Sequence, residues 1–261
     1  MTDRLVRYEI ADGVATLTLD SPHNRNAIST RLVEQLRQGL ADAATDAAVR
    51  AVVLTHTGGT FCAGADLSEA SAVAESTPEG LAAERTKQMT DLLRAIVELP
   101  KPVIGRIDGH VRAGGMGLVG ACDMVVAGPE STFALTEVRL GLAASIISLT
   151  VIPRLTPRAA GRYFLTGEKF GPREAEAIGL ITWAAEDSSE AVRELASTLR
   201  ACSPQGLAES KKLTTMRMLA DFDSYAKVLA EQSAGLFGSE EAVEGMTAFL
   251  QKRPPRWAVD G

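Results

Sequence analysis

Alternating apolar and polar positions open the chain and predict a β-hairpin. Residues 5–10 and 14–19 both alternate with the period of a half-buried strand. Asp12 and Gly13 lie between them, and an Asp-Gly pair is typical of the tight turn that joins two antiparallel strands. The chain is therefore expected to begin with two paired strands.

Helical and strand patterns then alternate up to about residue 190. A first helix is predicted from Ser29 or Thr30, with apolar residues at helical spacing at Leu32, Val33, Leu36 and Leu40. Strands are predicted at 51–55, 103–107, 124–127 and 131–134, and helices within 69–99, at 157–166 and from Pro172 onwards. Because no Pro- or Ser-rich linker separates these elements, we expect one continuous α/β body over residues 1–200.

The last quarter of the chain shows only helical patterns. Helices are predicted near 190–201, 204–219, 221–237 and 239–251. Ser239 begins the last of them, with Glu240 and Glu241 in its first turn, where negative charge suits the helix dipole. This tail contains more apolar residues than a helical flap on a filled core needs to bury. Residues 201–261 are therefore predicted to form a helical region for subunit packing.

Composition and charge exclude several classes of protein. The 261 residues are 46% hydrophobic and 23% charged, as in a folded globular protein. The net charge is −6, and no Lys/Arg cluster appears, which argues against a nucleic-acid-binding protein. No signal-peptide pattern opens the chain, and its longest uncharged apolar run, 140–152, is too short to cross a membrane. We therefore expect a cytoplasmic protein without a membrane segment.

Neither the cysteines nor the histidines predict a metal site or a disulfide framework. Cys62, Cys122 and Cys202 lie far apart and leave an odd thiol, so they are interpreted as small buried residues. The three histidines share no metal-type spacing. His23 is interpreted as a surface residue and His110 as a packing residue, with a catalytic role for His110 as the alternative.

Two glycine-rich segments, 61–67 and 108–117, are the main candidates for chemistry. Each follows a predicted strand, and small residues there let backbone N–H groups come close to a ligand. Each segment alone is also compatible with a structural turn. The second lacks the Gly-Lys-Ser/Thr of a phosphate loop and the acidic partner of a dinucleotide fingerprint. Together, however, two N–H donors from separate loops would form an oxyanion hole for a thioester enolate.

These segments resemble the enoyl-CoA hydratase/isomerase, or crotonase, family. The resemblance also covers 118–123, 133–142 and the opening 20–29, in the same order, so that it spans residues 5–190. It implies a crotonase-like spiral of repeated ββα turns, whose C-terminal helices commonly build a homotrimer that is often doubled to a hexamer. It also implies an acyl-CoA thioester as substrate and no separate cofactor, because coenzyme A is part of the substrate.

The resemblance assigns roles to individual residues. The backbone N–H groups of Ala65 and Gly114 would be the two oxyanion donors. The residues that would line the coenzyme A channel are Arg25, Ala27, Ala63, Asp66 and Leu67. Lys252 and Arg253, beyond the last helix, match a region that supplies cations to the coenzyme A phosphates in relatives; a solvated tail is the alternative.

One position departs from the family pattern. Hydratases of this family usually carry two glutamates around the bound water, and here the second is Glu137 while Gly117 occupies the first position. One carboxylate serves as both base and acid if the same water supplies the oxygen and the proton. The missing carboxylate removes a like charge, so the pKa of Glu137 is expected to be lower than in a pair unless burial compensates. A helix cap or an ion pair is the alternative role for Glu137.

The interpretation favoured by the sequence is hydration of a 2-enoyl-CoA, with Glu137 as acid and base. The alternatives are a Δ3,Δ2-enoyl-CoA isomerase that uses the same glutamate, and a catalytically silent acyl-CoA-binding scaffold. Residues 115–119 and 136–148 also resemble bacterial hydratases for branched, glutaconyl-type CoA esters, which have glycine at the first position. Gly117 would then leave room for the substrate. Arg112 and Arg139 would bind its carboxylate, or pair with Glu137 or Asp123 instead.

Overall fold

The predicted hairpin forms one edge of the larger of two sheets. The computed structural model describes residues 4–66 and 78–258. In it, β1 (Val6–Ala11) pairs antiparallel with β2 (Val14–Leu19), so that Val6 lies opposite Leu19. Asp12 and Gly13 make the turn with φ angles of 49° and 74°.

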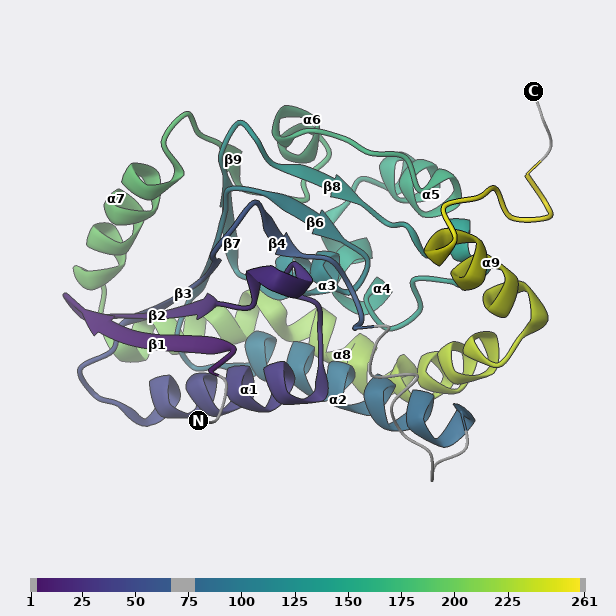
Figure 1. Cartoon of the computed structure of the whole chain (residues 1–261). Coiled ribbons are helices and arrows are strands. Elements are labelled where there is room, and N and C mark those ends of the chain that lie inside the picture. Colours follow the sequence, from purple (N-terminus) through teal and green to yellow (C-terminus); the bar gives the residue numbers. More distant parts are fainter. Residues whose placement is uncertain (1–3, 67–77, 259–261) are drawn as a thin grey trace.

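Two sheets of mainly parallel strands make up the body (Figure 1). The six-stranded sheet has the order β1-β2-β3-β5-β7-β9, where its last four members are β3 (Ala51–His56), β5 (Val103–Ile107), β7 (Met124–Ala127) and β9 (Trp183–Ala184). The three-stranded sheet has the order β4-β6-β8, with β4 (Thr60–Cys62), β6 (His110–Arg112) and β8 (Thr132–Ala134) all parallel. Each strand of the smaller sheet directly follows a strand of the larger one along the chain. This repetition confirms the predicted spiral of ββα turns.

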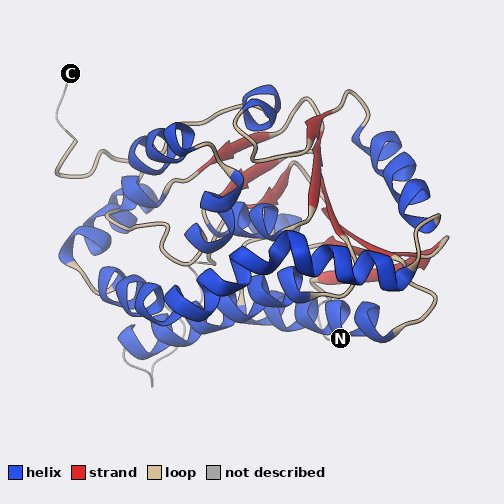
Figure 2. Ribbon diagram, turned by 180° about the vertical axis from the view of Figure 1, so that it is seen from behind, coloured by secondary structure: helices blue, strands red, loops and turns tan. Residues whose placement is uncertain are grey.

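Helices cover both faces of the larger sheet. Their bounds are α1 (Thr30–Thr45), α2 (Pro78–Glu98), α3 (Gly114–Ala121), α4 (Ser148–Val151), α5 (Pro157–Thr166), α6 (Pro172–Ala177), α7 (Ser188–Arg200), α8 (Pro204–Phe237) and α9 (Glu240–Leu250), with short 3-10 helices η1 (Pro22–Asn24), η3 (Glu137–Leu140) and η4 (Ile152–Arg154). Helix α1 begins as predicted, because the Ser29 hydroxyl accepts a hydrogen bond from the N–H of Leu32. Helices α1, α2 and α8 lie side by side on one side of the molecule, and α7 packs on β3, β5 and β7 (Figures 1 and 2).

The C-terminal region is helical as predicted, but its division into helices is different. Residues 204–219 and 221–237 were expected to form two helices, and they form the single helix α8 that runs across the back of the molecule (Figure 2). No proline or glycine interrupts 207–234, and the middle of the helix is buried through Met218 and Phe222. Packing against α2 therefore keeps the helix continuous.

Helices α8 and α9 both pack on their own chain. The Lys211 ammonium group of α8 is buried and lies 2.7 Å from a carboxylate oxygen of Asp123. Helix α9 approaches η3 closely, since a Cβ added at Gly245 would lie 2.5 Å from the carbonyl carbon of Leu140. None of the helices in the described ranges combines the length and the apolar composition needed to span a membrane.

Candidate functional site

The segment 20–29 has a fixed conformation, although much of it is loop. Arg25 and Asn26 both have positive φ angles, 59° and 52°. The buried side chain of Asn26 maintains this turn, because its carbonyl oxygen accepts a hydrogen bond from Ser21 N–H at 2.7 Å. Its amide nitrogen donates to the carbonyl oxygens of Thr57 (3.0 Å) and Thr60 (2.8 Å). The loop is thereby fastened to the turn between β3 and β4.

The same loop orients the backbone of Ala65. Ile28 and Ala65 form a parallel bridge, in which Ile28 N–H donates to Gly64 O at 2.7 Å and Asp66 N–H donates to Ile28 O at 3.0 Å. Because successive backbone groups of an extended segment point to opposite sides, the N–H of Ala65 points away from Ile28. It donates no hydrogen bond to any residue of the described ranges.

Gly114 begins helix α3 beside this segment. Its N–H belongs to the first turn, where no intrahelical acceptor exists, and it also has no hydrogen-bond partner among the described residues. The residue before it, Ala113, has φ 45° and ψ −120°, a strained conformation for a residue other than glycine. A Cβ placed on Gly64 would lie 2.9 Å from Ala113 Cβ and 3.8 Å from Gly114 N. The two segments that carry the predicted donors are therefore in direct contact.

Glu137 carries the most perturbed carboxylate of the region. It is the first residue of η3, shortly after β8. Its Oε2 atom is buried and has no hydrogen-bond partner in the described part of the chain. Burial raises the pKa of Glu137 to about 7, because a charged carboxylate is poorly solvated there, and the hydrogen bond from its own N–H lowers it only in part. Burial therefore outweighs the loss of a second carboxylate.

The space beside Gly117 is filled by protein. A Cβ at Gly117 would lie 2.5 Å from Ile147 Cγ2 and 3.3 Å from Leu93 Cδ1. Gly117 is itself buried. The expectation that this glycine leaves room for a substrate is thus not supported, because Ile147 occupies the room.

The two arginines that were candidates for a substrate carboxylate have other partners. Arg112 donates to Val111 O, to Thr132 O and to the Thr132 hydroxyl, each at 2.8 Å. Arg139 donates to Thr166 O at 3.1 Å. Within the described ranges, neither guanidinium forms an ion pair with Glu137 or Asp123.

The residues predicted for the coenzyme A channel differ in exposure. Arg25 is exposed, Ala63 and Asp66 are partly exposed, and Ala27 is buried. The N–H of Ala63 donates to Arg25 O at 3.1 Å, which joins the two parts of the predicted channel. Leu67 lies outside the described residues.

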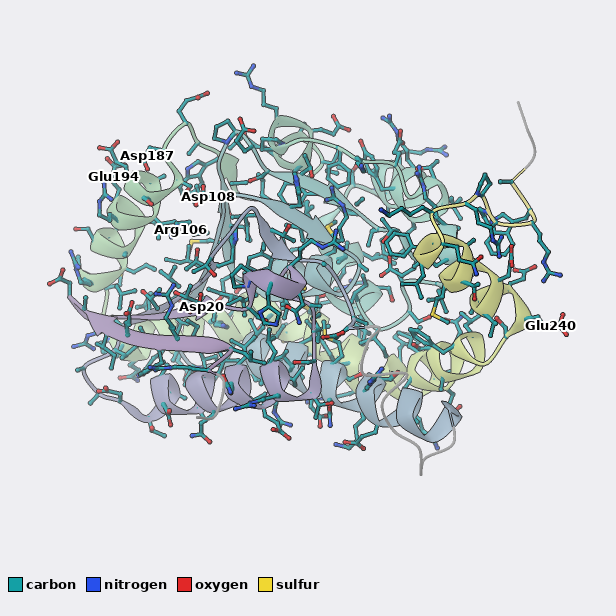
Figure 3. All side chains as sticks on the ribbon, viewed as in Figure 1. Asp20, Arg106, Asp108, Asp187, Glu194 and Glu240 are labelled. Carbon is teal, nitrogen blue, oxygen red and sulfur yellow. The ribbon has the colours of Figure 1, made fainter. Side chains whose placement is uncertain are left out.

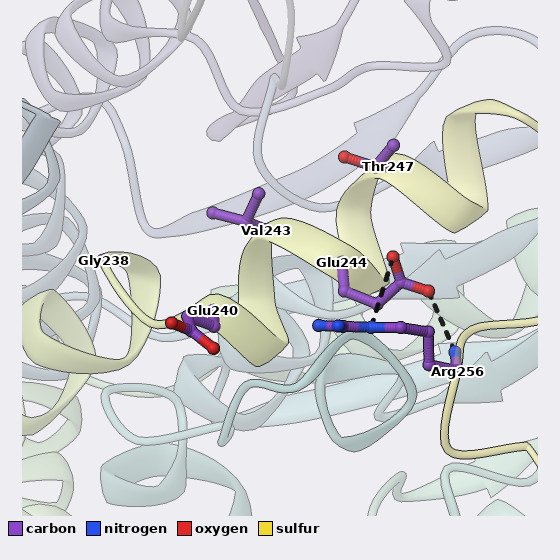
Figure 4. A pocket seen from close by; sticks show the side chains of 6 residues that line it. All are labelled: Gly238, Glu240, Val243, Glu244, Thr247 and Arg256. Atoms are coloured by element: carbon purple, nitrogen blue, oxygen red, sulfur yellow. Dashed lines mark hydrogen bonds and ion pairs between the residues drawn. The ribbon is translucent and has the colours of Figure 1, made fainter.

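Of the two cations predicted to bind phosphate, Arg253 is paired with a carboxylate of its own chain and Lys252 is exposed. Arg253 makes two hydrogen bonds to the carboxylate of Glu244, at 2.7 and 2.9 Å, and these hydrogen bonds lower the pKa of Glu244 to about 2. Arg256 N–H also donates to this carboxylate at 2.9 Å (Figure 4). Lys252 is exposed and has a φ angle of 54°. Of the two predicted phosphate-binding cations, Arg253 is therefore held by α9, and Lys252 faces solvent.

Three residues that the sequence did not single out shape this region. Asn26 fixes the first loop, Ile147 fills the space beside Gly117, and His56 accepts a hydrogen bond from Asp108 N–H. Asn26 lies within the segment 20–29, and asparagine tolerates positive φ, so the sequence contained a signal for its role. Ile147 and His56 act through residues distant in sequence, so no local pattern indicated them. No group of three His, Cys, Asp or Glu side chains within 4–66 and 78–258 is placed to hold a metal ion.

Comparisons relate this chain to known proteins over nearly its whole length. The family model described as enoyl-CoA hydratase/isomerase matches residues 9–260. A Bacillus subtilis protein named "Probable enoyl-CoA hydratase" is 33% identical over 248 residues, 94% of this chain and 95% of the relative. The 2,3-dehydroadipyl-CoA hydratase of Escherichia coli is 32% identical over 247 residues, 93% of this chain and 94% of the relative. The crystal structure of an enoyl-CoA hydratase from Mycobacterium avium is 59% identical, with a TM-score of 0.91 over 98% of this chain and 100% of that one.

Proposed function

This chain belongs to the enoyl-CoA hydratase/isomerase family, and from that premise we propose that it adds water to the double bond of a 2-enoyl-CoA. The observation that carries the proposal is the buried carboxylate of Glu137. Its raised pKa, about 7, means that both the acid and the base form are populated near neutral pH. A single group with both forms available is suited to take a proton from water and return it to carbon.

The proposed step uses two backbone donors and one side chain. The N–H groups of Ala65 and Gly114 donate hydrogen bonds to the thioester oxygen as negative charge develops on it, which stabilises the enolate more than the bound substrate. The carboxylate of Glu137 removes a proton from water while the water oxygen bonds to C3. The protonated Glu137 then delivers that proton to C2. One O–H bond and the π bond between C2 and C3 break, and one C–O and one C–H bond form.

Substrate binding is proposed to use the fixed loop and its neighbours. Arg25, Ala63 and Asp66 have exposure compatible with contact to coenzyme A, and Lys252 is available to a phosphate. Ala27 belongs to the same loop and is buried. The guanidinium groups of Arg112 and Arg139 are hydrogen-bonded to backbone carbonyl groups and so are not directed to a substrate carboxylate. We therefore favour an uncharged acyl group over a glutaconyl-type one.

Isomerisation of a 3-enoyl-CoA is the second candidate. It is favoured by the packing of Ile147 on Gly117, which leaves no place for a second carboxylate at position 117. Transfer of one proton from C2 to C4 needs one carboxylate and no bound water. Glu137, Ala65 and Gly114 would keep their roles.

The proposal includes a homotrimer or hexamer in the cytoplasm. Large apolar side chains remain exposed on the C-terminal helices, among them Leu213 (73% exposed) and Met216 (65%) on α8 and Leu250 (67%) on α9. Since these helices already cover their own core, the exposed apolar side chains are available to a neighbouring subunit.

Three assays separate the candidate functions. Hydration predicts that crotonyl-CoA loses the absorbance of its conjugated thioester and gains the mass of one water. Isomerisation predicts that a 3-enoyl-CoA gains that absorbance with no change in mass. Binding of acyl-CoA with neither reaction would instead support a silent scaffold. A panel of straight, branched and carboxylated acyl-CoAs, read by mass spectrometry, would identify the acyl class; preference for a carboxylated member would contradict the choice of an uncharged group.

A further inference from the structure

His56 occupies a buried position where the two sheets meet. It is the last residue of β3, and only 9% of it is exposed. The N–H of Asp108, just after β5, donates to His56 Nε2 at 3.1 Å. Figure 3 labels Arg106 and Asp108 at this end of the larger sheet.

The hydrogen bond determines how the ring is protonated. Because Nε2 accepts, the proton of the neutral ring must be on Nδ1. The Nδ1 atom is buried and has no hydrogen-bond partner in the described residues. The bond from Asp108 is thus the hydrogen bond that fixes the ring among the described residues, and the backbone of Thr57 and Gly58 also acts on it.

The ring also fits closely between two turns. Its plane is perpendicular to that of Phe61 in β4, with centroids 5.6 Å apart. A Cβ at Gly109 would lie 3.0 Å from His56 Cε1 and 2.5 Å from Gly59 O. His56 thus contacts the turn that leads into β4 and the turn that leads into β6.

Strands β4 and β6 lead to the two candidate donors. They pair in parallel, with Thr60 opposite His110, and His110 N–H donates to Gly59 O at 3.1 Å. Three residues after β4 the chain reaches Ala65, and two residues after β6 it reaches Gly114. Any shift of one strand along the other would change the separation of the two N–H groups.

We propose that His56 is a positioning residue: by accepting the Asp108 N–H while its ring packs on Phe61, it holds β4 and β6 in the register that brings the N–H groups of Ala65 and Gly114 together. The inference rests on the proposed function in so far as these two groups are taken as the oxyanion donors. Since a misplaced donor weakens an oxyanion hole steeply, a residue outside the site influences the rate in this way.

The arrangement is also sensitive to acid. A proton on Nε2 would abolish the acceptor of the Asp108 N–H. Burial is the largest influence on the pKa of His56; it lowers the pKa and so keeps the ring neutral. The backbone of Thr57 and Gly58 and the nearby Asp108 raise the pKa, and Arg106 lowers it. These two groups lie at the end of β5, where Arg106 Nε is 3.6 Å from Asp108 Oδ2. From α7, the uncharged Ser188 hydroxyl donates to Asp108 Oδ1 at 2.5 Å.

The test compares two substitutions that differ in the acceptor. His56→Phe keeps a ring but cannot accept a hydrogen bond, whereas His56→Gln offers a side-chain oxygen near the place of Nε2. We expect His56→Phe to lower kcat at least tenfold with KM changed less than twofold, and His56→Gln to recover most of kcat. The exposed His110 of β6 gives the control, because His110→Phe should change neither kcat nor KM appreciably.

A spectroscopic measurement makes the test independent of turnover. A conjugated 2,4-dienoyl-CoA should absorb at longer wavelength when two N–H groups polarise its carbonyl, and His56→Phe should lose this shift. Unchanged kcat and an unchanged shift in His56→Phe would overturn the proposal, as would a loss of kcat that His56→Gln does not repair. If His56→Phe does not fold, His56→Asn replaces it, because its shorter side chain does not bring an oxygen to the Asp108 N–H. His56→Asn should lose the kcat and the shift that His56→Gln keeps, and equal values in these two variants would overturn the proposal. If the wild type shows the shift but no turnover, the proposed function fails while the role of His56 stands.

Discussion

Ile147 occupies the position that a side chain at Gly117 would need, since a Cβ there would lie 2.5 Å from Ile147 Cγ2. The arrangement is fixed by a second contact, in which the Thr150 hydroxyl donates to Gly117 O at 3.0 Å. Helix α4 is thus held against α3 at the position where two-glutamate hydratases would carry a carboxylate. In the proposed mechanism, Glu137 therefore acts without a partner at that position.

Gly117→Glu is therefore expected to destabilise the protein rather than improve hydration. Overpacking alone costs about 1–3 kcal/mol, and a buried carboxylate without a partner adds to that cost. Activity should fall on crotonyl-CoA and on a carboxylated enoyl-CoA alike. Thermal unfolding and turnover of both substrates provide the measurement. The double variant Gly117→Glu/Ile147→Ala is the control, and it should recover part of the lost stability. A single variant with unchanged melting temperature and faster hydration would show that this account of Ile147 is wrong.

Glu137→Gln should keep the fold and acyl-CoA binding while it removes most activity. The change leaves the volume nearly unaltered but abolishes acid and base function, which is worth roughly a hundredfold or more in turnover. The measurement is kcat for the wild type and the variant, together with the Kd of a non-reactive acyl-CoA. Near wild-type turnover in the variant would exclude Glu137 from the mechanism and favour the silent scaffold.

Glu137→Gln should also make the protein more stable relative to the wild type as the pH rises. Between pH 4.5 and about 7, the folded state retains a proton on Glu137 that the unfolded state releases. Wild-type stability should therefore fall as pH rises through this window, by up to about 3 kcal/mol, and Glu137→Gln should not show this loss. Melting temperatures of both proteins at pH 5 and pH 8 give the test. A difference between the two proteins that is the same at both pH values would refute the raised pKa.

Ala113→Gly should stabilise the turn before α3. A residue other than glycine at φ 45° and ψ −120° is strained by about 1–3 kcal/mol, and the added freedom of the unfolded chain offsets roughly 0.5–1 kcal/mol. A net gain of about 1 kcal/mol corresponds to a rise in Tm of roughly 2–4 °C. Ala41→Gly, in the interior of α1, is the control and should lower Tm. Equal destabilisation by both substitutions would mean that Ala113 is not strained.

Lys211→Met should be strongly destabilising. The ammonium group binds Asp123, Ile96 O and Lys101 O at 2.7, 2.9 and 3.1 Å, so its removal leaves a carboxylate without its counter-charge. Breaking a buried pair in this way costs about 3–5 kcal/mol. The neighbouring Lys212, exposed in a pair with Glu209, is the matched control, and Lys212→Met should change stability by less than about 1 kcal/mol. Chemical denaturation of both variants measures the difference; similar losses would contradict the role given to Lys211.

The molar mass in solution tests the proposed assembly. Light scattering at micromolar concentration should give three or six times 27.6 kDa, because the exposed apolar side chains of α8 and α9 are then covered. Leu213→Glu should shift the mass toward that of smaller species. A wild-type mass of one chain at the same concentration would refute the trimer.

The sequence by itself determined most of the elements and the family. Periodicity and turn residues depend on contacts between near neighbours along the chain. They therefore predict the hairpin, the Ser29 cap, most strands and the candidate donor segments. The resemblance carried by 61–67, 108–123 and 133–142 indicated the same family that the comparisons show.

Only the tertiary structure decided the properties of the site. The raised pKa of Glu137 comes from its surroundings, and the filling of the space at Gly117 comes from Ile147, thirty residues away. The continuity of α8 depends on its packing against α2, and the partners of Arg112 are supplied by neighbouring strands. Desolvation and steric contact depend on distances between residues remote in sequence, which no local pattern encodes.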